Sequence, residues 1–461
     1  GGHTGDTGGH TGDTGGHTGD TGGHTGDTGD SCEEGVCLLS WRLHEEMESL
    51  VYVSWEQTLP GTVHVEYSFD PDVWLSTPSF LADKGSQEQL VVGIPFATEA
   101  AWRVVLEEVR SFDGESIVTG PVPTGLPLCT VTVADETAWL STGKYLLSSI
   151  NQRAGGWTGG TYWTFIMDRQ CRVVWARAAP DSHWTLFASV SLDGSYLMWD
   201  EATYWSDWDH GAGSSIHKTW LDEEFEEFPA PGLHHTFVEL PDGTLAWGSQ
   251  DHGGEEALVE RGPDDEDETI LWTCEEDWPG SRSCESNGLF YQASTDTFLY
   301  SFYTNNSVVE VSRSEGTSLW WAGTVSDDGT SRRYTFDPTN SQFSWQHGIS
   351  YTASGTLLLS TEARFGSTTI TAVREYEVDH ESGLLRNVWT FNSGVYASTN
   401  GDAWRLSNGN TLHVLGAAGQ IMEADPEGRL VWHVDYHAQK LLGRGEFIED
   451  LYALVKPSPD P

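Results

Sequence analysis

The chain has 461 residues, of which 70 are acidic and 23 are basic, so its formal net charge is -47. A surface that negative repels phosphate backbones and anionic lipid headgroups, which excludes nucleic acid as a natural partner. The length predicts two or three domains, and no apolar run is long enough to span a bilayer. We interpret the acidity as a solvated, salt-adapted exterior and expect no cofactor, with calcium binding as the alternative.

The N-terminal segment is a low-complexity repeat. Residues 1–28 are four copies of Gly-Gly-His-Thr-Gly-Asp-Thr, with almost no apolar content. Such a segment cannot bury a core, so we predict that residues 1–31 form a disordered, flexible linker. The histidine in each copy could instead help to gather a transition metal, although flexible ligands lose much entropy when they close around an ion.

The same repeat suggests a location. It resembles the spacers that follow the lipid-modified cysteine in surface lipoproteins of some Gram-negative bacteria, and the numbering starts on Gly1 rather than Met. We therefore expect that a signal segment was removed upstream of Gly1. The expected location is extracytoplasmic, whether periplasmic, cell-surface or secreted, and membrane contact would come only through a lipid anchor. The sequence leaves the oligomeric state open.

Six cysteines form an even set, which indicates pairing in an oxidising compartment. Close spacing suggests two pairs, and the remaining two cysteines would tie residues near the domain junction to the first unit of the second domain. The expected pairs are Cys32 with Cys37, Cys274 with Cys284, and Cys129 with Cys171. Zinc binding is the alternative, but the chain has no paired Cys-x-x-Cys motifs.

Residues 32–128 consist of short alternating runs separated by turn signals such as Leu59-Pro60-Gly61. The runs are Val51–Trp55, Val63–Tyr67, Leu90–Ile94 and Trp102–Val109. Strands about ten residues apart predict a small antiparallel β-sandwich. The order of features is similar to a fibronectin type III domain, and the expected role is that of a spacer or docking module.

Residues 129–457 repeat one pattern, two strands around a glycine turn, at intervals of about 50 to 60 residues. The six hairpins are Ala138–Ser148, Phe187–Trp199, His235–Trp247, Gly288–Ser301, His347–Leu359 and Ala403–Leu415. Between them lie second hairpins that end on tryptophan: Met167–Trp175, Val309–Trp320, Tyr376–Trp389 and Glu423–Trp432. Four strands per repeat and six repeats predict an all-β, six-bladed β-propeller. The one segment with a helical pattern is Gln439–Leu442.

Three hairpins begin on polar residues that could meet at the centre of such a ring. His347 opens one hairpin directly behind Trp345 and Gln346, and His235 opens an earlier one. Asn287 holds the related place in a third hairpin. The structural interpretation of His347 is a polar cap at the entry of a strand, and the functional interpretation is a nucleophile.

Residues from about Cys129 to Val455 resemble bacterial arylsulfate sulfotransferases. The segments that carry the resemblance are Trp345-Gln346-His347 with Gly355–Leu359, His234-His235 with Leu240–Leu245, and Ala403–Asn410 with Glu423 and Gly428–Trp432. Glycine turns before apolar strands occur in every propeller, so the order and spacing of these segments carry the similarity. The resemblance implies an N-terminal sandwich joined to a six-bladed propeller.

The resemblance also implies a ping-pong reaction without a nucleotide sulfate donor. His347 would attack the sulfur of an aryl sulfate, hold the sulfuryl group as a sulfohistidine and pass it to a phenolic acceptor. His235 would donate to the leaving or bridging oxygen, while Asn287 and Arg364 would bind the non-bridging oxygens. Further substrate contacts are expected from His234, Glu285 and Trp345. Glu285 could orient a histidine or accept the proton of the acceptor, although a carboxylate beside a sulfate is electrostatically costly.

The sequence departs from the family pattern at three places. Glu285 stands where the family has a histidine, and Phe302 and Tyr303 stand where an arginine is expected. Thr361-Glu362-Ala363 replaces an Asp-Asn-Gly turn, although Arg364 follows it. These changes remove donors that would stabilise charge on the sulfuryl oxygens. The competing hypothesis is a secreted, non-catalytic propeller that binds a ligand or a partner protein through its channel face.

Overall fold

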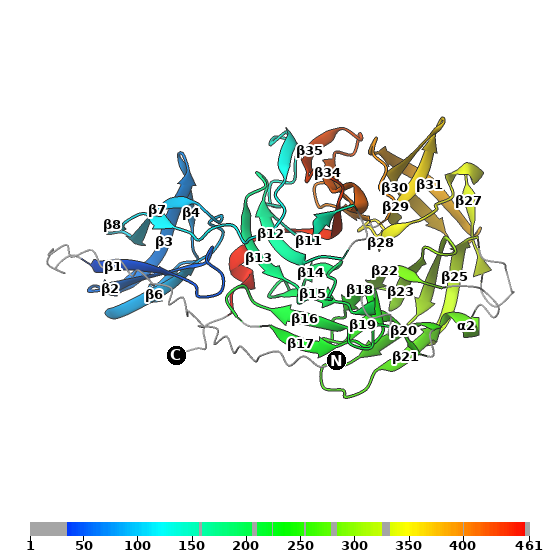
Figure 1. Ribbon diagram of the computed structural model, residues 1–461, viewed down its shortest axis with the longest axis horizontal. Helices are drawn as coiled ribbons and strands as arrows, with labels where there is room; N and C mark the ends of the chain where they lie inside the picture. Colours follow the sequence, from blue (N-terminus) through cyan, green and yellow to red (C-terminus); the bar gives the residue numbers. More distant parts are fainter. Residues whose placement is uncertain are drawn as a thin grey trace, which may run out of the picture.

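The computed structural model describes residues 35–155, 159–204, 210–223, 225–252, 255–277, 284–324, 332–399 and 401–456. The predicted linker over residues 1–31 and Cys32 lie outside these ranges. The described chain is built from strands, and its helical turns are short: α2 (Cys274–Asp277), η1 (Thr339–Ser341), η2 (Gly416–Ala418) and η3 (Leu451–Leu454). Figure 1 shows a small lobe, in blue, beside a larger ring of sheets that runs from cyan to red.

The small lobe is a two-layer sandwich. One sheet has the order β1-β2-β6 and the other the order β4-β3-β7-β8, with β5 on β3 and β9 on β7. Its strands are β1 (Val36–Leu43), β2 (Val51–Gln57), β3 (Gly61–Asp70), β4 (Val73–Ser76), β5 (Phe80–Ala82), β6 (Gly85–Val91), β7 (Glu99–Leu106), β8 (Arg110–Asp113) and β9 (Ile117–Val118). Alternate residues of β2 and β3 are buried between the layers, as Val53 and Val65 are, because side chains on a strand alternate between its faces. The fibronectin type III likeness stays a prediction.

The described part of the larger region contains six sheets, which we number as blades 1 to 6, and the predicted six-bladed propeller is confirmed. Blade 1 is β36 (Lys440–Ile448), β11 (Tyr145–Ala154), β12 (Tyr162–Asp168) and β13 (Val173–Ala178); blade 2 is β14 (Ala188–Val190), β15 (Leu197–Glu201), β16 (Ser215–Thr219) and β17 (Glu226–Pro229). Blade 3 is β18 (Leu233–Glu239), β19 (Leu245–His252), β20 (Glu255–Arg261) and β21 (Thr269–Thr273); blade 4 is β22 (Ser286–Gln292), β23 (Thr297–Phe302), β24 (Ser307–Ser312), β25 (Thr317–Gly323) and β26 (Arg332–Arg333). Blade 5 is β28 (His347–Tyr351), β29 (Leu357–Phe365), β30 (Thr368–Asp379), β31 (Leu384–Asn392) and β27 (Thr335–Asp337); blade 6 is β32 (Asp402–Arg405), β33 (Thr411–Leu415), β34 (Gln420–Ala424), β35 (Leu430–Asp435) and β10 (Thr130–Ala134).

The blades form a closed ring. The inner strands β18, β22, β28, β32, β36 and β14 contact one another in that order, and blade 2 meets β18 through β15. Closure also holds the two ends of the region together, because β36 is the inner strand of blade 1 and β10 pairs with β35 on the outside of blade 6. The tryptophans of the outer hairpins lie between blades as expected, with Trp175, Trp320 and Trp432 fully buried.

Two sequence predictions about the ring are wrong, and ring closure explains both. Ala138–Ser148 is not a hairpin, because β11 takes its inner partner from the far end of the chain, where Leu147 pairs with Glu446. The helix predicted over Gln439–Leu442 is absent, because those residues lead into β36. A strand left unpaired would expose a row of backbone hydrogen-bonding groups, and a short local pattern does not reveal a partner almost 300 residues away.

The sandwich packs directly against blade 1. The Arg172 guanidinium donates to both carboxylate oxygens of Asp70 at 2.7 and 2.8 Å, and the Phe96 amide donates to the Val173 carbonyl at 3.0 Å. One apolar core runs from Leu50 of the sandwich to Trp175 of blade 1. The lobe and the ring therefore share a continuous core.

Two predicted disulfides are confirmed, Cys129–Cys171 at the junction of sandwich and ring and Cys274–Cys284 between the last strand of blade 3 and the first strand of blade 4. Disulfides persist in oxidising compartments, so these pairs are compatible with the expected extracytoplasmic location. Among the described residues, no helix is long and apolar enough to cross a membrane.

Candidate functional site

The polar residues that open the inner strands gather at one end of the ring. His235 is the third residue of β18, Asn287 the second of β22 and His347 the first of β28. The pairing register of each strand with its neighbour shifts at that residue. Such bulges turn a side chain out of the regular alternation, so these three side chains can point into the channel although the strands around them are buried.

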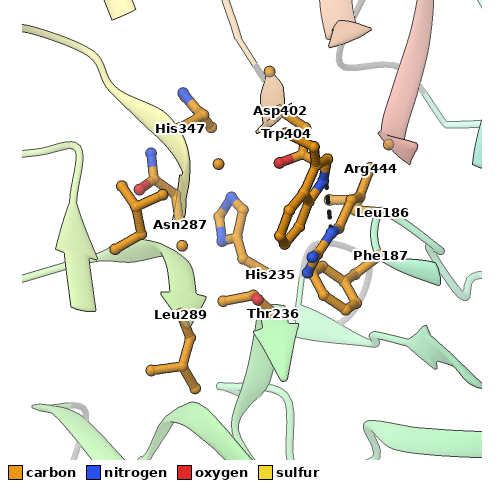
Figure 2. A pocket seen from close by; sticks show the side chains of 15 residues that line it. Leu186, Phe187, His235, Thr236, Asn287, Leu289, His347, Asp402, Trp404 and Arg444 are labelled. Carbon is orange, nitrogen blue, oxygen red and sulfur yellow. Dashed lines mark hydrogen bonds and ion pairs between the residues drawn. The ribbon is translucent and has the colours of Figure 1, made fainter. Parts of the chain in front are cut away.

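These side chains line one cavity that is partly open to solvent. The polar lining residues form two groups, which face each other in Figure 2. One group consists of His235, Asn287 and His347, which we call the histidine side. The other consists of Asp402, Trp404 and Arg444, which we call the arginine side.

His347 has a fixed tautomer. Its Nδ1 lies 3.1 Å from the Trp345 carbonyl oxygen, and a carbonyl can only accept, so Nδ1 carries the proton and Nε2 keeps a lone pair. Trp345 has a φ of 49°, a left-handed turn that brings its carbonyl back to the ring. His347 is 9% exposed. Burial lowers its pKa to about 4, although the hydrogen bond to the Trp345 carbonyl acts in the opposite direction. At neutral pH the imidazole is therefore uncharged and its Nε2 is nucleophilic.

His235 belongs to a buried chain of three titratable groups. Its Nδ1 lies 2.7 Å from Nδ1 of His234, and Nε2 of His234 lies 3.0 Å from Glu256 Oε2. The Glu256 carboxylate also accepts from the Tyr300 hydroxyl and, at 3.1 Å, from Gln250. A contact between two Nδ1 atoms requires one donor and one acceptor, so the tautomers of the two histidines are coupled.

Electrostatics favour an ionised carboxylate at the inner end of this chain. Burial would raise the pKa of Glu256, but the charge of His234 and hydrogen bonds from His234, Tyr300 and Ser286 outweigh it and lower the pKa. Burial, His234 and His347 together hold the pKa of His235 well below its usual range. His235 is thus neutral, and a hydrogen-bonded path leads from it through His234 to Glu256.

Asn287 connects two blades and still has a donor to offer. Its Nδ2 donates to the Gln346 carbonyl at 2.6 Å, and its Oδ1 accepts from the Ser301 hydroxyl at 2.9 Å. These contacts fix which end of the amide is nitrogen. One of the two N–H groups remains for a ligand in the cavity.

The arginine side was not recognised in the sequence. Arg444 Nε lies 3.3 Å from Asp402 Oδ2, and its guanidinium stacks 3.8 Å from the Trp404 ring centroid and 4.4 Å from that of Phe187. Trp404 Nε1 donates to Asp402 at 2.6 Å. The Arg444 side chain is 14% exposed. A sequence signal was present for Trp404, which lies in the predicted hairpin Ala403–Leu415, and for Asp402 directly before it, but Arg444 lies in β36, which was not recognised as a strand.

Arg364 lies elsewhere than the sequence suggested. It is exposed near the end of β29, opposite Thr369 at the turn into β30, and does not line the cavity. The arginine that lines the cavity is Arg444.

The three expected substrate contacts lie around the cavity rather than on its wall. His234 is buried behind His235. Glu285 accepts a hydrogen bond from the Tyr303 hydroxyl, and the Tyr303 ring centroid lies 6.1 Å from that of His235 and 6.4 Å from that of His347. Trp345 is half-exposed and lies 6.1 Å from Tyr303, ring centroid to ring centroid. Tyr303 therefore lies beside both histidines. It is one of the two residues at which the sequence comparison leads us to expect an arginine.

The described residues offer no obvious metal site. Across the described ranges, no group of three or more His, Cys, Asp or Glu side chains is arranged to hold a metal ion. The donor set of the cavity, imidazole, amide and guanidinium, instead suits an anionic group that accepts hydrogen bonds.

A comparison with protein families supports the resemblance seen in the sequence. Residues 291–437, from the end of β22 to just beyond β35, match the family model described as arylsulfotransferase (ASST). The match confirms that the chain resembles this family over about a third of its length. His347 and Asp402 lie inside the matched segment, while His235, Asn287 and Arg444 lie outside it. No curated protein matches the chain in sequence.

Solved structures resemble the chain only distantly. A protein of unknown function from Bacteroides caccae is 14% identical with a TM-score of 0.42, over 63% of this chain and 93% of that one. The β-propeller domain of Cps50 (Swd1) from Myceliophteria thermophila is 15% identical with a TM-score of 0.38, over 68% of this chain and 87% of that one. A streptogramin B lyase is 13% identical with a TM-score of 0.38, over 66% and 86%. The site is therefore interpreted from its own geometry.

Proposed function

From the resemblance to arylsulfotransferases over residues 291–437, we propose that this protein transfers a sulfuryl group from an aryl sulfate to a phenolic acceptor, with His347 Nε2 as the transient carrier. The observation that carries the proposal is the state of His347, which is buried, neutral and tautomerically fixed by the Trp345 carbonyl. His347 lines a cavity whose wall also includes His235 and Arg444.

In the first half-reaction, the Nε2 lone pair of His347 forms a bond to sulfur while the bond from sulfur to the aryl oxygen breaks. The electron pair of that bond stays on the aryl oxygen, which leaves as a phenolate or takes up a proton. In the second half-reaction, the phenol oxygen forms a bond to the sulfur of the sulfohistidine while the bond from sulfur to Nε2 breaks and returns its electron pair to His347. The phenol proton goes to Nε2 of His235, the reverse of the proton transfer in the first half-reaction. Atoms and electrons balance without a nucleotide or a redox partner.

The chain from Glu256 to His235 can supply and recover that proton. In its acid form, His234 carries protons on both nitrogens, paired with the Glu256 carboxylate, and His235 presents Nε2–H to the cavity. When Nε2–H goes to the leaving oxygen, Nδ1 of His235 takes the proton of His234 across the 2.7 Å contact. His235 thus exchanges a proton without ever becoming charged, which agrees with its strongly lowered pKa. A general acid or base of this kind contributes about 10²- to 10⁴-fold in rate.

The arginine side would bind the non-bridging sulfuryl oxygens. A guanidinium clamped between Trp404 and Phe187 is held in place before the reaction begins, so little reorganisation is needed as charge builds on the oxygens. The remaining N–H of Asn287 would donate from the opposite wall. In this account Arg444 takes the role that the sequence comparison had assigned to Arg364.

The proposal is tested by steady-state transfer from 4-nitrophenyl sulfate to phenol, followed as nitrophenolate release and phenyl sulfate formation. The variant His347→Ala should lose transfer to the background rate and keep its melting temperature within a few degrees. A matched control is His437→Ala, which removes an imidazole whose side chain is 63% exposed and should leave the rate unchanged. Transfer that persists in His347→Ala would overturn the nucleophile. If the parent protein releases no nitrophenolate at any pH, a propeller that only binds a ligand or partner becomes the better description.

A further inference from the structure

Beside the two cavity histidines lie aromatic rings and a carboxylate, and a carboxylate is unexpected next to a site for an anion. Tyr303 follows β23, and its ring lies nearly parallel to that of His347, with an interplanar angle of 17° and a centroid separation of 6.4 Å. Trp345 is 48% exposed and inclined by 32° to Tyr303. The two rings therefore provide an aromatic surface next to the nitrogen proposed to carry the sulfuryl group.

Glu285 places negative charge at this surface. Its carboxylate accepts the Tyr303 hydroxyl proton in a hydrogen bond, and no arginine, lysine or histidine forms an ion pair with it among the residues that the structure describes. Tyr204 lies near the same charge, since burial, Glu285 and Glu256 together raise its pKa to about 12. The positive group of the cavity, Arg444, belongs to the arginine side and is already paired with Asp402.

Such an arrangement is costly for an aryl sulfate that brings only negative charge. A carboxylate near an anionic ligand repels it, and the net charge of -47 adds to that repulsion at long range. The cost is removed if the aryl part of the ligand carries a cation, because an ammonium group would pair with the carboxylate and rest on the aromatic faces. The same carboxylate repels anionic aryl groups and offers neutral ones no ion pair, so it selects for cationic aryl groups.

We propose that the aryl compounds handled by this site carry an ammonium substituent, bound by Glu285 and the rings of Tyr303 and Trp345. The inference rests on the proposed function, because it takes the aryl group to extend from His347 over the neighbouring Tyr303. It names the substrate class as sulfate esters of phenolic amines and the amines themselves as acceptors. Both half-reactions use one site, so the preference applies to donor and acceptor alike.

The first test compares three acceptors with a fixed donor, 4-nitrophenyl sulfate: tyramine, which is cationic, 4-ethylphenol, which is neutral and of nearly the same shape, and 3-(4-hydroxyphenyl)propionate, which is anionic. The expected kcat/KM is about tenfold higher for tyramine than for 4-ethylphenol and lowest for the propionate. In Glu285→Gln, the ratio of kcat/KM for tyramine to that for 4-ethylphenol should fall to about one.

A matched control removes a similar carboxylate at the other end of the ring. Glu239 accepts a hydrogen bond from the Tyr196 hydroxyl, as Glu285 does from Tyr303, but it lies at the far end of β18 from His235. Glu239→Gln should keep the preference for tyramine. Equal kcat/KM for tyramine and 4-ethylphenol in the parent protein, or an unchanged ratio in Glu285→Gln, would overturn the proposal.

A binding measurement separates this proposal from the proposed function. Isothermal titration of tyramine and of 4-ethylphenol needs no turnover and should give about tenfold tighter binding of tyramine, abolished in Glu285→Gln. If nitrophenolate is never released but this difference in affinity is found, sulfuryl transfer is overturned and the cation site stands. If transfer occurs and the two compounds bind equally well, the cation site is overturned and transfer stands.

Discussion

The two sides of the cavity are built by different means. The histidine side comes from the openings of inner strands whose partners follow within a few residues, as β29 follows His347 in β28. The arginine side has its cation only because the ring closes, since Arg444 lies on β36, the strand that joins the end of the chain to blade 1, whereas Asp402 and Trp404 lie on the locally paired β32. The comparison teaches that local hairpins position the proposed nucleophile and proton carrier, while the group that would neutralise the sulfuryl oxygens depends on a long-range pairing.

The largest expected effect among our tests of this comparison belongs to the arginine side. Arg444→Gln removes the cation proposed to face the developing charge, and kcat/KM for transfer should fall by about 10²-fold or more. Arg364→Gln is the matched control, because that side chain is exposed on β29 away from the cavity, and its kcat/KM should change by less than about twofold. The reverse order of the two effects, measured in the same assay, would return the role to Arg364.

A smaller effect is expected on the histidine side when the proton chain is broken. Glu256→Gln cannot stabilise the doubly protonated form of His234. Transfer from phenyl sulfate, whose phenolate is a poor leaving group, should therefore fall by about 10- to 10²-fold. Transfer from 4-nitrophenyl sulfate should change much less, because nitrophenolate leaves without help from an acid. A purely structural role of Glu256 would slow both donors alike.

The control for that variant is another buried carboxylate beside a histidine. Glu201 lies 3.5 Å from His217 in blade 2, and neither residue lines the cavity. Glu201→Gln should leave the ratio of the two donors unchanged, whatever it does to the melting temperature. A donor-dependent loss in this variant would show that the assay reports stability rather than proton transfer.

The smallest effect concerns pH. In the proposed reaction the neutral form of His347 is the nucleophile, and burial lowers its pKa from the usual 6.5 to about 4. Release from 4-nitrophenyl sulfate should therefore continue below pH 6.5 and fail as the pH approaches about 4. Burial also lowers the pKa of His413, to about 3. Both groups bind protons more readily in the unfolded chain, so the free energy of unfolding should decline as pH falls from 6.5 toward 4. An acid limb of the rate near pH 6.5 in a fully folded protein would contradict the buried, neutral histidine.

The sequence revealed much of the ring and half of the site. Glycine turns between apolar strands are local signals, so the hairpins from Phe187 onward and the histidines at their openings could be read directly. Arg444 could not be read, because nothing near it in the sequence shows that β36 pairs with β11. Arg364 was favoured because it follows the turn after Leu359, but extension of β29 and β30 beyond the start of β28 carries it away from the channel. Residues on locally paired strands are thus predictable, while positions set by ring closure or by hairpin length are not.

The most direct test of the account is to find the sulfuryl group on the protein. The parent chain is mixed with 4-nitrophenyl sulfate without acceptor, stopped rapidly and analysed as intact protein and as peptides. We predict one sulfuryl adduct per chain, located on His347, lost on addition of a phenolic acceptor and absent from His347→Ala. Release of nitrophenolate without any adduct, or an adduct on another residue that survives in His347→Ala, would contradict the account.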